Sequence, residues 1–242
     1  MPREQKRSMR TAPHRTPFVT VKFAQSLDGR IATATGDSKW ISGSGARRFV
    51  HKLRREHDAI LLGIGTVLID DPELTVRLVR GRNPLRIVID SRLRVPLTAR
   101  VLANGAARGT LIVTSKSADR ARAEKIKSLG ADVLRLPRSK GDSGIDLARL
   151  LEELCRRGIK SVLVEGGKGI ITSLLSARAV DRLVAVIAPK ILGQGIEAVG
   201  DLEITKLNNA IVFSSFRTIR LGADIIFDGR LSSRGLPIAN GA

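Results

Sequence analysis

Residues 63–77 read GIGTVLIDDPELTVR, and the fold is best worked out from this stretch. They follow a short apolar run, residues 59–62, which has the length of a buried strand. The glycines Gly63 and Gly65 would let a ligand approach the backbone closely, and the amides after them can hold a phosphate. Pro72 ends any helix that begins here, because it has no N–H and forces the preceding residue out of the helical region. The pattern fits a plain strand, turn and proline-terminated helix equally well, so other parts of the chain must decide between the two interpretations.

The length and composition are typical of one globular α/β domain. The 242 residues can bury a sizeable core, and 43% of them are hydrophobic. There is no run of about 18 apolar residues, which a membrane span would need. The first 15 residues are basic but lack the apolar segment of a secretory signal, so we expect a cytoplasmic protein. The single cysteine, Cys155, excludes an internal disulfide and a cysteine-based metal cluster.

A formal net charge of +19 indicates polyanionic partners: nucleic acid, an acidic membrane or phosphorylated small molecules. Proteins that bind single-stranded nucleic acid usually add exposed aromatic side chains for stacking. This chain has six Phe, one Trp and no Tyr, and its basic residues are spread along its length. A diffuse positive field that attracts phosphorylated ligands therefore fits better than specific nucleic-acid binding. A basic RNA-binding protein and a solvated basic surface without function remain the alternatives.

The order of the expected elements predicts a mostly parallel sheet flanked by helices, with an antiparallel edge at the C-terminal end. We expect residues 1–15 to be a basic disordered arm, residues 16–231 the single domain, and residues 232–242 a frayed tail. Ser42 or Ser44 is expected to cap a helix whose buried stripe contains Phe49, Val50 and Leu53. The expected strands are residues 18–24, 59–62, 86–90, 110–114, 133–136, 161–165, 183–187, 211–219 and 224–227, and the later helices are residues 118–129, 145–157 and a stretch through 175.

Two loops at the ends of expected strands have the composition of phosphate-binding loops. Residues 166–169 read GGKG between a strand and an apolar helix, the order in which backbone amides and a helix N-terminus hold a pyrophosphate. Residues 91–94 read SRLR after another strand, and two arginines there would suit the 2′-phosphate that separates NADP from NAD. The alternatives are a tight strand-to-helix connection and an ordinary charged loop.

Several single residues have both a functional and a structural interpretation. Lys22 interrupts an apolar strand, either as a residue that points to solvent or as a cation at the mouth of a site. Trp40, the only tryptophan, is more typical of packing than of ligand stacking. His51 and His57 lie six residues apart and form no metal-ligand pair, so we expect no metal site.

Seven motifs occur along the chain: residues 26–30 (SLDGR), 36–38 (GDS), 65–68 (GTVL), 70–77 (DDPELTVR), 88–91 (VIDS), 164–167 (VEGG) and 187–190 (IAPK). Together they resemble the pyrimidine reductases of riboflavin biosynthesis, which form the C-terminal half of bacterial bifunctional deaminase-reductases. The resemblance covers residues 16–231 and implies a dihydrofolate-reductase-like fold, NADPH (with NADH as a possibility) and a homodimer. The cysteine and histidine ligands of a zinc deaminase are absent from the 242 residues, so we expect a free-standing reductase similar to the archaeal and fungal enzymes.

The resemblance also implies roles for individual residues. The residues expected against NADPH are Ala24, Trp40, Thr66, Asp70, Ser91, Arg92, Leu93, Arg94, Gly166, Gly167, Lys168 and Gly169. Those expected against the substrate are Ser38, Arg54, Leu74, Arg77 and Glu165, with Lys22 nearby, and Lys22, Asp28 and Glu165 are the candidates for moving protons. Lys168 stands where the family often has a small residue, so it is expected either to contact a phosphate or to point outward.

The expected reaction is reduction of 2,5-diamino-6-ribosylamino-4(3H)-pyrimidinone 5′-phosphate, by hydride transfer to C1′ of the ring-opened imine. The alternatives are the same reduction of the deaminated uracil compound and a dihydrofolate-type reductase. A dihydrofolate-type enzyme would accept a pteridine and tolerate loss of Arg54 and Arg77.

Overall fold

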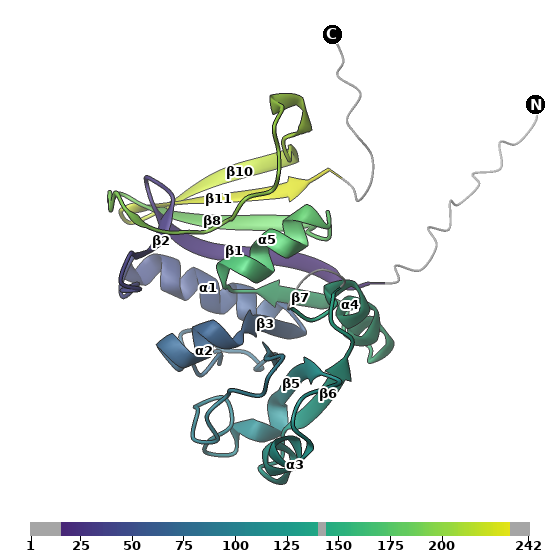
Figure 1. Cartoon of the computed structure of the whole chain (residues 1–242). Coiled ribbons are helices and arrows are strands. Elements are labelled where there is room, and N and C mark those ends of the chain that lie inside the picture. The colour runs from purple at the N-terminus through teal and green to yellow at the C-terminus, as the bar shows by residue number, and fades with distance from the viewer. Residues whose placement is uncertain (1–15, 140–143, 233–242) are drawn as a thin grey trace, which may run out of the picture.

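A computed structural model describes residues 16–139 and 144–232. Within them, one nine-stranded sheet runs through the molecule in the order β10-β11-β8-β1-β7-β3-β4-β5-β6 (Figure 1). The predicted arm, residues 1–15, lies outside the described residues, as do residues 233–242 of the predicted tail. The strands are β1 (Phe18–Ser26), β3 (Ala59–Gly63), β4 (Leu85–Ile89), β5 (Thr110–Ser115), β6 (Asp132–Leu136), β7 (Ser161–Val164), β8 (Arg182–Ala188), β10 (Phe213–Leu221) and β11 (Asp224–Leu231).

The strands from β8 to β6 are parallel, and the C-terminal edge is antiparallel, as predicted. β1 pairs in parallel with both β7 and β8, and β3 pairs in parallel with both β7 and β4. β11 then joins β8 antiparallel, and β10 joins β11 across a tight turn at Gly222, whose φ is +66°. The carboxyl ends of β1, β7, β3 and β4 therefore meet at one edge, where open α/β sheets bind ligands.

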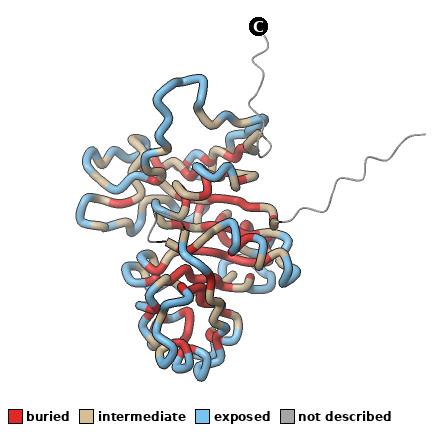
Figure 2. Tube along the Cα trace, turned by 45° about the vertical axis from the view of Figure 1, so that its right-hand side comes forward, coloured by how far each residue is buried: buried red, intermediate tan, exposed pale blue. Residues whose placement is uncertain are grey.

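Helices cover both faces of this sheet. On one face, α4 (Leu147–Arg156) and α5 (Lys168–Ser176) pack on side chains such as Val162 and Val164. On the other face, α1 (Ser44–Glu56) packs on Leu163, and α2 (Ile64–Asp70) and α3 (Arg120–Ser128) cover β3, β4 and β5. Successive residues of β7 thus point into different cores, as the two-residue period of a strand requires. The buried middle layer and the exposed outer loops are visible in Figure 2.

The predicted serine cap of helix α1 was wrong, whereas its predicted apolar stripe packs on the core, with Phe49 less buried than expected. Its N-cap is Gly43, with no side-chain cap, and the Gly43 N–H donates instead to Oδ2 of Asp224 at 2.7 Å. The buried residues of the helix are Ala46, Val50, His51 and Leu53, whereas Phe49 is only partly buried. A distant carboxylate replaces the expected serine cap because β11 places it beside the helix start.

Other elements were missed because few of their residues are buried and apolar. β2 (Arg30–Thr33) pairs antiparallel with β9 (Gly195–Glu197) in a separate two-stranded sheet. Single turns of 3₁₀ helix lie at Ala106–Gly109 and Leu207–Asn209. The helix in the opening stretch, α2, ends at Asp70, before Pro72, as predicted. Asp71 then adopts a left-handed conformation. None of the helices in the described ranges is long and apolar enough to cross a membrane.

Candidate active site

Two glycine-bearing connections lie side by side at the carboxyl edge of the sheet. β3 runs through Gly63 into α2, and β7 runs through Glu165, Gly166 and Gly167 into α5. The Gly63 N–H donates to the carbonyl of Gly166 at 3.3 Å, which ties the two connections together. Gly63 and Gly167 are the N-cap residues of their helices, and neither makes a side-chain cap hydrogen bond. The N-termini of α2 and α5, neither capped by a side chain, thus lie at the same carboxyl edge of the sheet.

The second connection needs glycine for conformational reasons. Gly166 has a φ of +131°, which side chains rarely adopt, whereas a Cβ added at Gly166 or Gly167 would make only an ordinary contact, 3.6 Å, with Oγ1 of Thr66. The peptide bond between the two glycines is cis. The backbone here can be approached closely and presents amides at a helix start, which fits the pyrophosphate of a dinucleotide. The predicted residues Thr66, Gly166 and Gly167 are therefore brought together, and Gly169 follows in the first turn of α5.

A buried ion pair lies directly beside this cradle. Arg54, on α1, donates through Nε and Nη2 to the two carboxylate oxygens of Glu165, both at 2.7 Å. The two side chains are only 12% and 10% exposed. Arg54 also donates through Nη1 to the carbonyl of Thr75 at 3.1 Å. The Arg54 guanidinium is therefore engaged mainly by Glu165, so Arg54 is less available to bind a phosphate than the sequence suggests.

Lys22 completes a cluster of charges on the α1 face of the sheet. Burial lowers the pKa of Lys22, Glu165 opposes that shift, and Arg54 adds to it. Burial raises the pKa of Glu165, but Arg54 and Lys22 together hold it below its usual value. Lys22 is therefore withdrawn from solvent and lies next to a carboxylate that stays ionised.

The segment 71–78 closes the site on the side of α1. Leu74 is buried, so its side chain serves the core. Arg77 is half-exposed and pairs with Glu73 at 2.7 Å, and its backbone N–H donates to Nδ1 of His51 at 3.0 Å. Sequence reasoning missed His51, although it lies one helical turn before Arg54 and so shares its face of α1.

The loop after β4 begins at the same edge of the sheet, because Ile89, the last residue of β4, pairs with Gly63. Asp90 accepts the Val95 N–H at 2.7 Å, and Arg122 donates to the carbonyls of Leu93 and Val95. Leu93 is only 1% exposed, so it shapes the loop from within the core. Ser91 is partly exposed, and both Arg92 and Arg94 are exposed.

Asp28 lies in a different setting from the other two proton-transfer candidates. Its carboxylate accepts the Ser26 hydroxyl at 2.5 Å and the backbone N–H groups of Leu192 and Gly193. These bonds, that from Ser26 foremost, lower the pKa of Asp28 to about 2. Asp28 therefore joins the β1–β2 turn to the loop after β8 and is poorly suited to donate a proton near neutral pH.

The remaining predicted residues differ in their partners and exposure. Lys168 pairs with Glu197 on β9 at 2.6 Å, so its ammonium group is already engaged by a carboxylate. Trp40 is 66% exposed, and the guanidinium of Arg47 lies 4.7 Å from its ring centroid. Ala24 lies two residues beyond Lys22 on β1, Asp70 is the last residue of α2, and Ser38 is partly exposed in the loop before α1.

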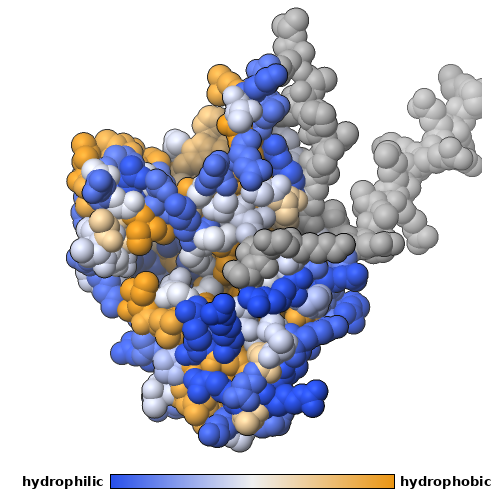
Figure 3. Space-filling model, viewed as in Figure 1, coloured by the Kyte–Doolittle hydropathy of each residue, from blue (hydrophilic) through white to orange (hydrophobic). Residues whose placement is uncertain are grey.

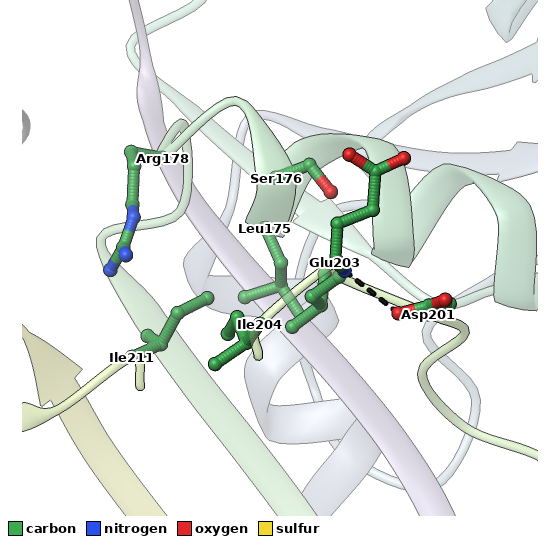
Figure 4. Close-up of a pocket in the computed structure, with 8 residues that line it drawn as sticks. Leu175, Ser176, Arg178, Asp201, Glu203, Ile204 and Ile211 are labelled. Carbon is green, nitrogen blue, oxygen red and sulfur yellow. Dashed lines mark hydrogen bonds between the residues drawn. The ribbon is translucent and has the colours of Figure 1, made fainter. Parts of the chain in front are cut away.

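Two cavities lie away from these residues. One, of about 310 Å³, lies between the end of α5 and residues 201–211 and is lined by residues such as Leu175, Arg178 and Glu203 (Figure 4). The other, of about 380 Å³, lies at the amino edge of the sheet near Phe18 and Cys155. Neither contains a residue predicted for the site, and in the described ranges no three His, Cys, Asp or Glu side chains gather to hold a metal.

Comparison with known families matches residues 17–226 to the model of the RibD C-terminal domain. The chain belongs to the RibD C-terminal domain family. It is 41% identical to the riboflavin biosynthesis protein RibD of Aquifex aeolicus over 87% of this chain, and it spans 56% of that relative's length. It is also 41% identical to the 2,5-diamino-6-ribosylamino-4(3H)-pyrimidinone 5′-phosphate reductase of Methanothermobacter thermautotrophicus, over 88% of this chain and 97% of that protein.

Solved structures of the RibD family share the fold. Acinetobacter baumannii RibD superposes with a TM-score of 0.78 at 30% identity, covering 91% of this chain and 59% of that one. The yeast riboflavin biosynthesis reductase Rib7 gives a TM-score of 0.71 at 25% identity, covering 92% and 93%. A dihydrofolate reductase from Enterococcus faecalis matches at 12% identity with a TM-score of 0.50, and this confirms the predicted fold class.

Proposed function

We propose that this RibD-family chain reduces 2,5-diamino-6-ribosylamino-4(3H)-pyrimidinone 5′-phosphate to its ribitylamino product, with NADPH as the cofactor. The observation that carries the proposal is the position of the Glu165–Arg54–Lys22 cluster directly beside the glycine cradle. The similarity over nearly the whole length of the Methanothermobacter reductase supports reduction of the diamino compound, before deamination.

The residues at the edge of the sheet fit NADPH. The cradle of Gly166, Gly167 and Thr66 would receive the pyrophosphate, and the exposed Arg92 and Arg94 would meet a 2′-phosphate. When bound, NADPH would supply the hydride for C1′ of the substrate. Replacement of both arginines by alanine is expected to raise KM for NADPH far more than KM for NADH, which tests the proposed preference.

The charged cluster would orient the substrate and move a proton. Glu165, fixed by Arg54, would accept hydrogen bonds from ribose hydroxyls or pyrimidine amino groups. Arg77 is the more exposed of the two arginines and would meet the 5-phosphate. Lys22, with its lowered pKa, is the group best suited to donate the proton that ring opening needs.

The deciding experiment measures NADPH oxidation with three substrates: the diamino compound, its deaminated analogue and dihydrofolate. Turnover of the diamino compound alone is expected, with the ribitylamino product identified by mass spectrometry. Turnover of the analogue alone would move the enzyme to the step after deamination. Oxidation with dihydrofolate alone, or with none of the three, would overturn the proposed function.

We also propose that the protein is a cytoplasmic homodimer, as the family resemblance implies. Light scattering after size-exclusion chromatography tests the assembly, and a monomer at micromolar concentration would contradict it.

A further inference from the structure

The segment 71–78 carries Leu74 and Arg77 but forms no regular secondary structure within residues 71–77. Its backbone polar groups therefore need partners from outside a helix or sheet, because unpaired polar groups are costly in a partly buried segment. The structure supplies side chains for this purpose. Oδ1 of Asn83 accepts the Val76 N–H at 2.7 Å, and Nη1 of Arg54 donates to the Thr75 carbonyl at 3.1 Å.

His51 provides the third of these contacts. Its Nδ1 accepts the backbone N–H of Arg77 at 3.0 Å, and the N–H of Leu78 lies 3.5 Å from the same atom. The residue is only 6% exposed. Two backbone donors that converge on Nδ1 require this nitrogen to be unprotonated, so the ring proton lies on Nε2. An imidazolium would place an N–H against the amide of Arg77 and break the contact.

The surroundings of His51 keep the ring neutral. Burial lowers the pKa of His51 to about 4, and the charges of Arg54 on α1 and Arg77 on the segment act in the same direction. Glu165, which follows β7, opposes them. The acceptor at Nδ1 is therefore in place throughout the neutral pH range.

Arg54 and His51 together join two parts of the site through one helix. They lie three residues apart on α1, and Arg54 binds both Glu165 and the Thr75 carbonyl while His51 binds the next amides of the segment. We propose that His51 is a positioning residue, which holds the Arg77 backbone against α1 and so fixes where Arg77 meets the substrate phosphate beside Glu165. This inference rests on the proposed function for the identity of the phosphate.

The test compares two substitutions at this position. His51→Leu fills similar space without an acceptor, whereas His51→Asn offers Oδ1 near the place of Nδ1. With the diamino substrate, His51→Leu is expected to raise KM for that substrate about fivefold or more, the worth of one hydrogen bond. KM for NADPH should stay within about twofold of the wild-type value, and His51→Asn should return KM for the diamino substrate most of the way to wild type.

Hydrogen exchange of the protein without ligands gives a second measurement, which does not depend on turnover. Peptides that cover residues 74–82 should exchange faster in His51→Leu and return toward wild-type exchange in His51→Asn. His57→Leu is the matched control, because His57 is also buried, but it contacts Leu53 and Thr20. That variant should lower thermal stability without selectively opening residues 74–82.

The outcomes separate the two proposals. If wild-type protein fails to turn over the diamino substrate, the proposed function fails, and hydrogen exchange alone decides the role of His51. Unchanged exchange of residues 74–82 in a folded His51→Leu protein would overturn the positioning role. So would an equal rise in KM for substrate and NADPH, or a His51→Asn variant as impaired as His51→Leu.

Discussion

At the scale of single residues, the Glu165–Arg54 pair carries the sharpest stability prediction. Both side chains are largely buried, so removing one partner leaves an uncompensated charge. Glu165→Gln also leaves Arg54 beside Lys22, whose charge repels it. We expect a loss of about 3 kcal/mol in the free energy of unfolding, measured by urea denaturation. The double variant Glu165→Leu with Arg54→Met should lose less free energy of unfolding than Glu165→Leu and Arg54→Met lose separately when their losses are summed. Strict additivity would show that the pair is not coupled.

Lys22 carries the corresponding prediction for catalysis. Lys22→Met removes a buried charge, so the protein should stay folded while kcat falls by about 10²-fold, the usual worth of a proton donor. Burial holds the pKa of Lys22 below the ordinary lysine value of 10.5, so an acid at this position should lose activity as pH rises through that lowered value. The alkaline limb of the kcat profile should disappear in Lys22→Arg, and a variant with unchanged kcat would remove Lys22 from the mechanism.

Residues such as these could be located from the sequence, but their partners could not. The family resemblance predicted Lys22, Arg54 and Glu165 as site residues, yet Arg54 and Glu165 are 111 residues apart and pair only because α1 packs across β7. Lys168 was predicted to contact a phosphate or point outward, and its partner Glu197 comes from a strand too short to recognise in the sequence.

At the scale of elements, Asp28 joins the β1–β2 turn to the loop after β8. Its folded pKa of about 2 lies below its ordinary value of 3.8, so its contribution to stability is present above about pH 4 and is lost as pH falls toward 2. Asp28→Asn should therefore lower the melting temperature at pH 7, and the difference from wild type should shrink between pH 4 and pH 2. Asp132→Asn, at an exposed position on β6, is the control. A fall in kcat without a change in melting temperature would instead support the catalytic role predicted from the sequence.

The elements also show where local sequence signals are sufficient. The long apolar strands were predicted correctly because burial on both faces leaves a clear pattern in the sequence. The start of α1 was not predicted correctly, because the carboxylate that accepts the Gly43 N–H belongs to Asp224, 181 residues away. Local patterns thus predict the sheet and most helices, whereas the contacts that set helix ends and the β2–β9 pair depend on the finished fold.

At the scale of the whole molecule, the net charge of +19 should act on the rate of substrate capture. Hydrophilic residues are spread over the face in Figure 3 rather than gathered in one stripe, which agrees with the dispersed basic residues of the sequence. Such a field attracts a phosphorylated substrate at long range and is screened within about 10 Å at 0.1 M salt. We expect kcat/KM for the phosphorylated substrate to fall severalfold between about 0.05 M and 0.5 M salt, with a smaller change in kcat.

The dephosphorylated substrate is the matched control for this whole-molecule effect, because it has the same reacting group without the charge that the field attracts. Its kcat/KM should fall much less over the same salt range. An equal fall for both compounds would show that salt acts on the fold or the active site rather than on capture.

The same field would explain inhibition by RNA that competes with the phosphorylated substrate at low salt and no longer competes at about 0.2 M salt, since non-specific binding to phosphates falls steeply with salt. RNA binding that persists at that salt, in a protein that does not oxidise NADPH, would instead favour the RNA-binding alternative.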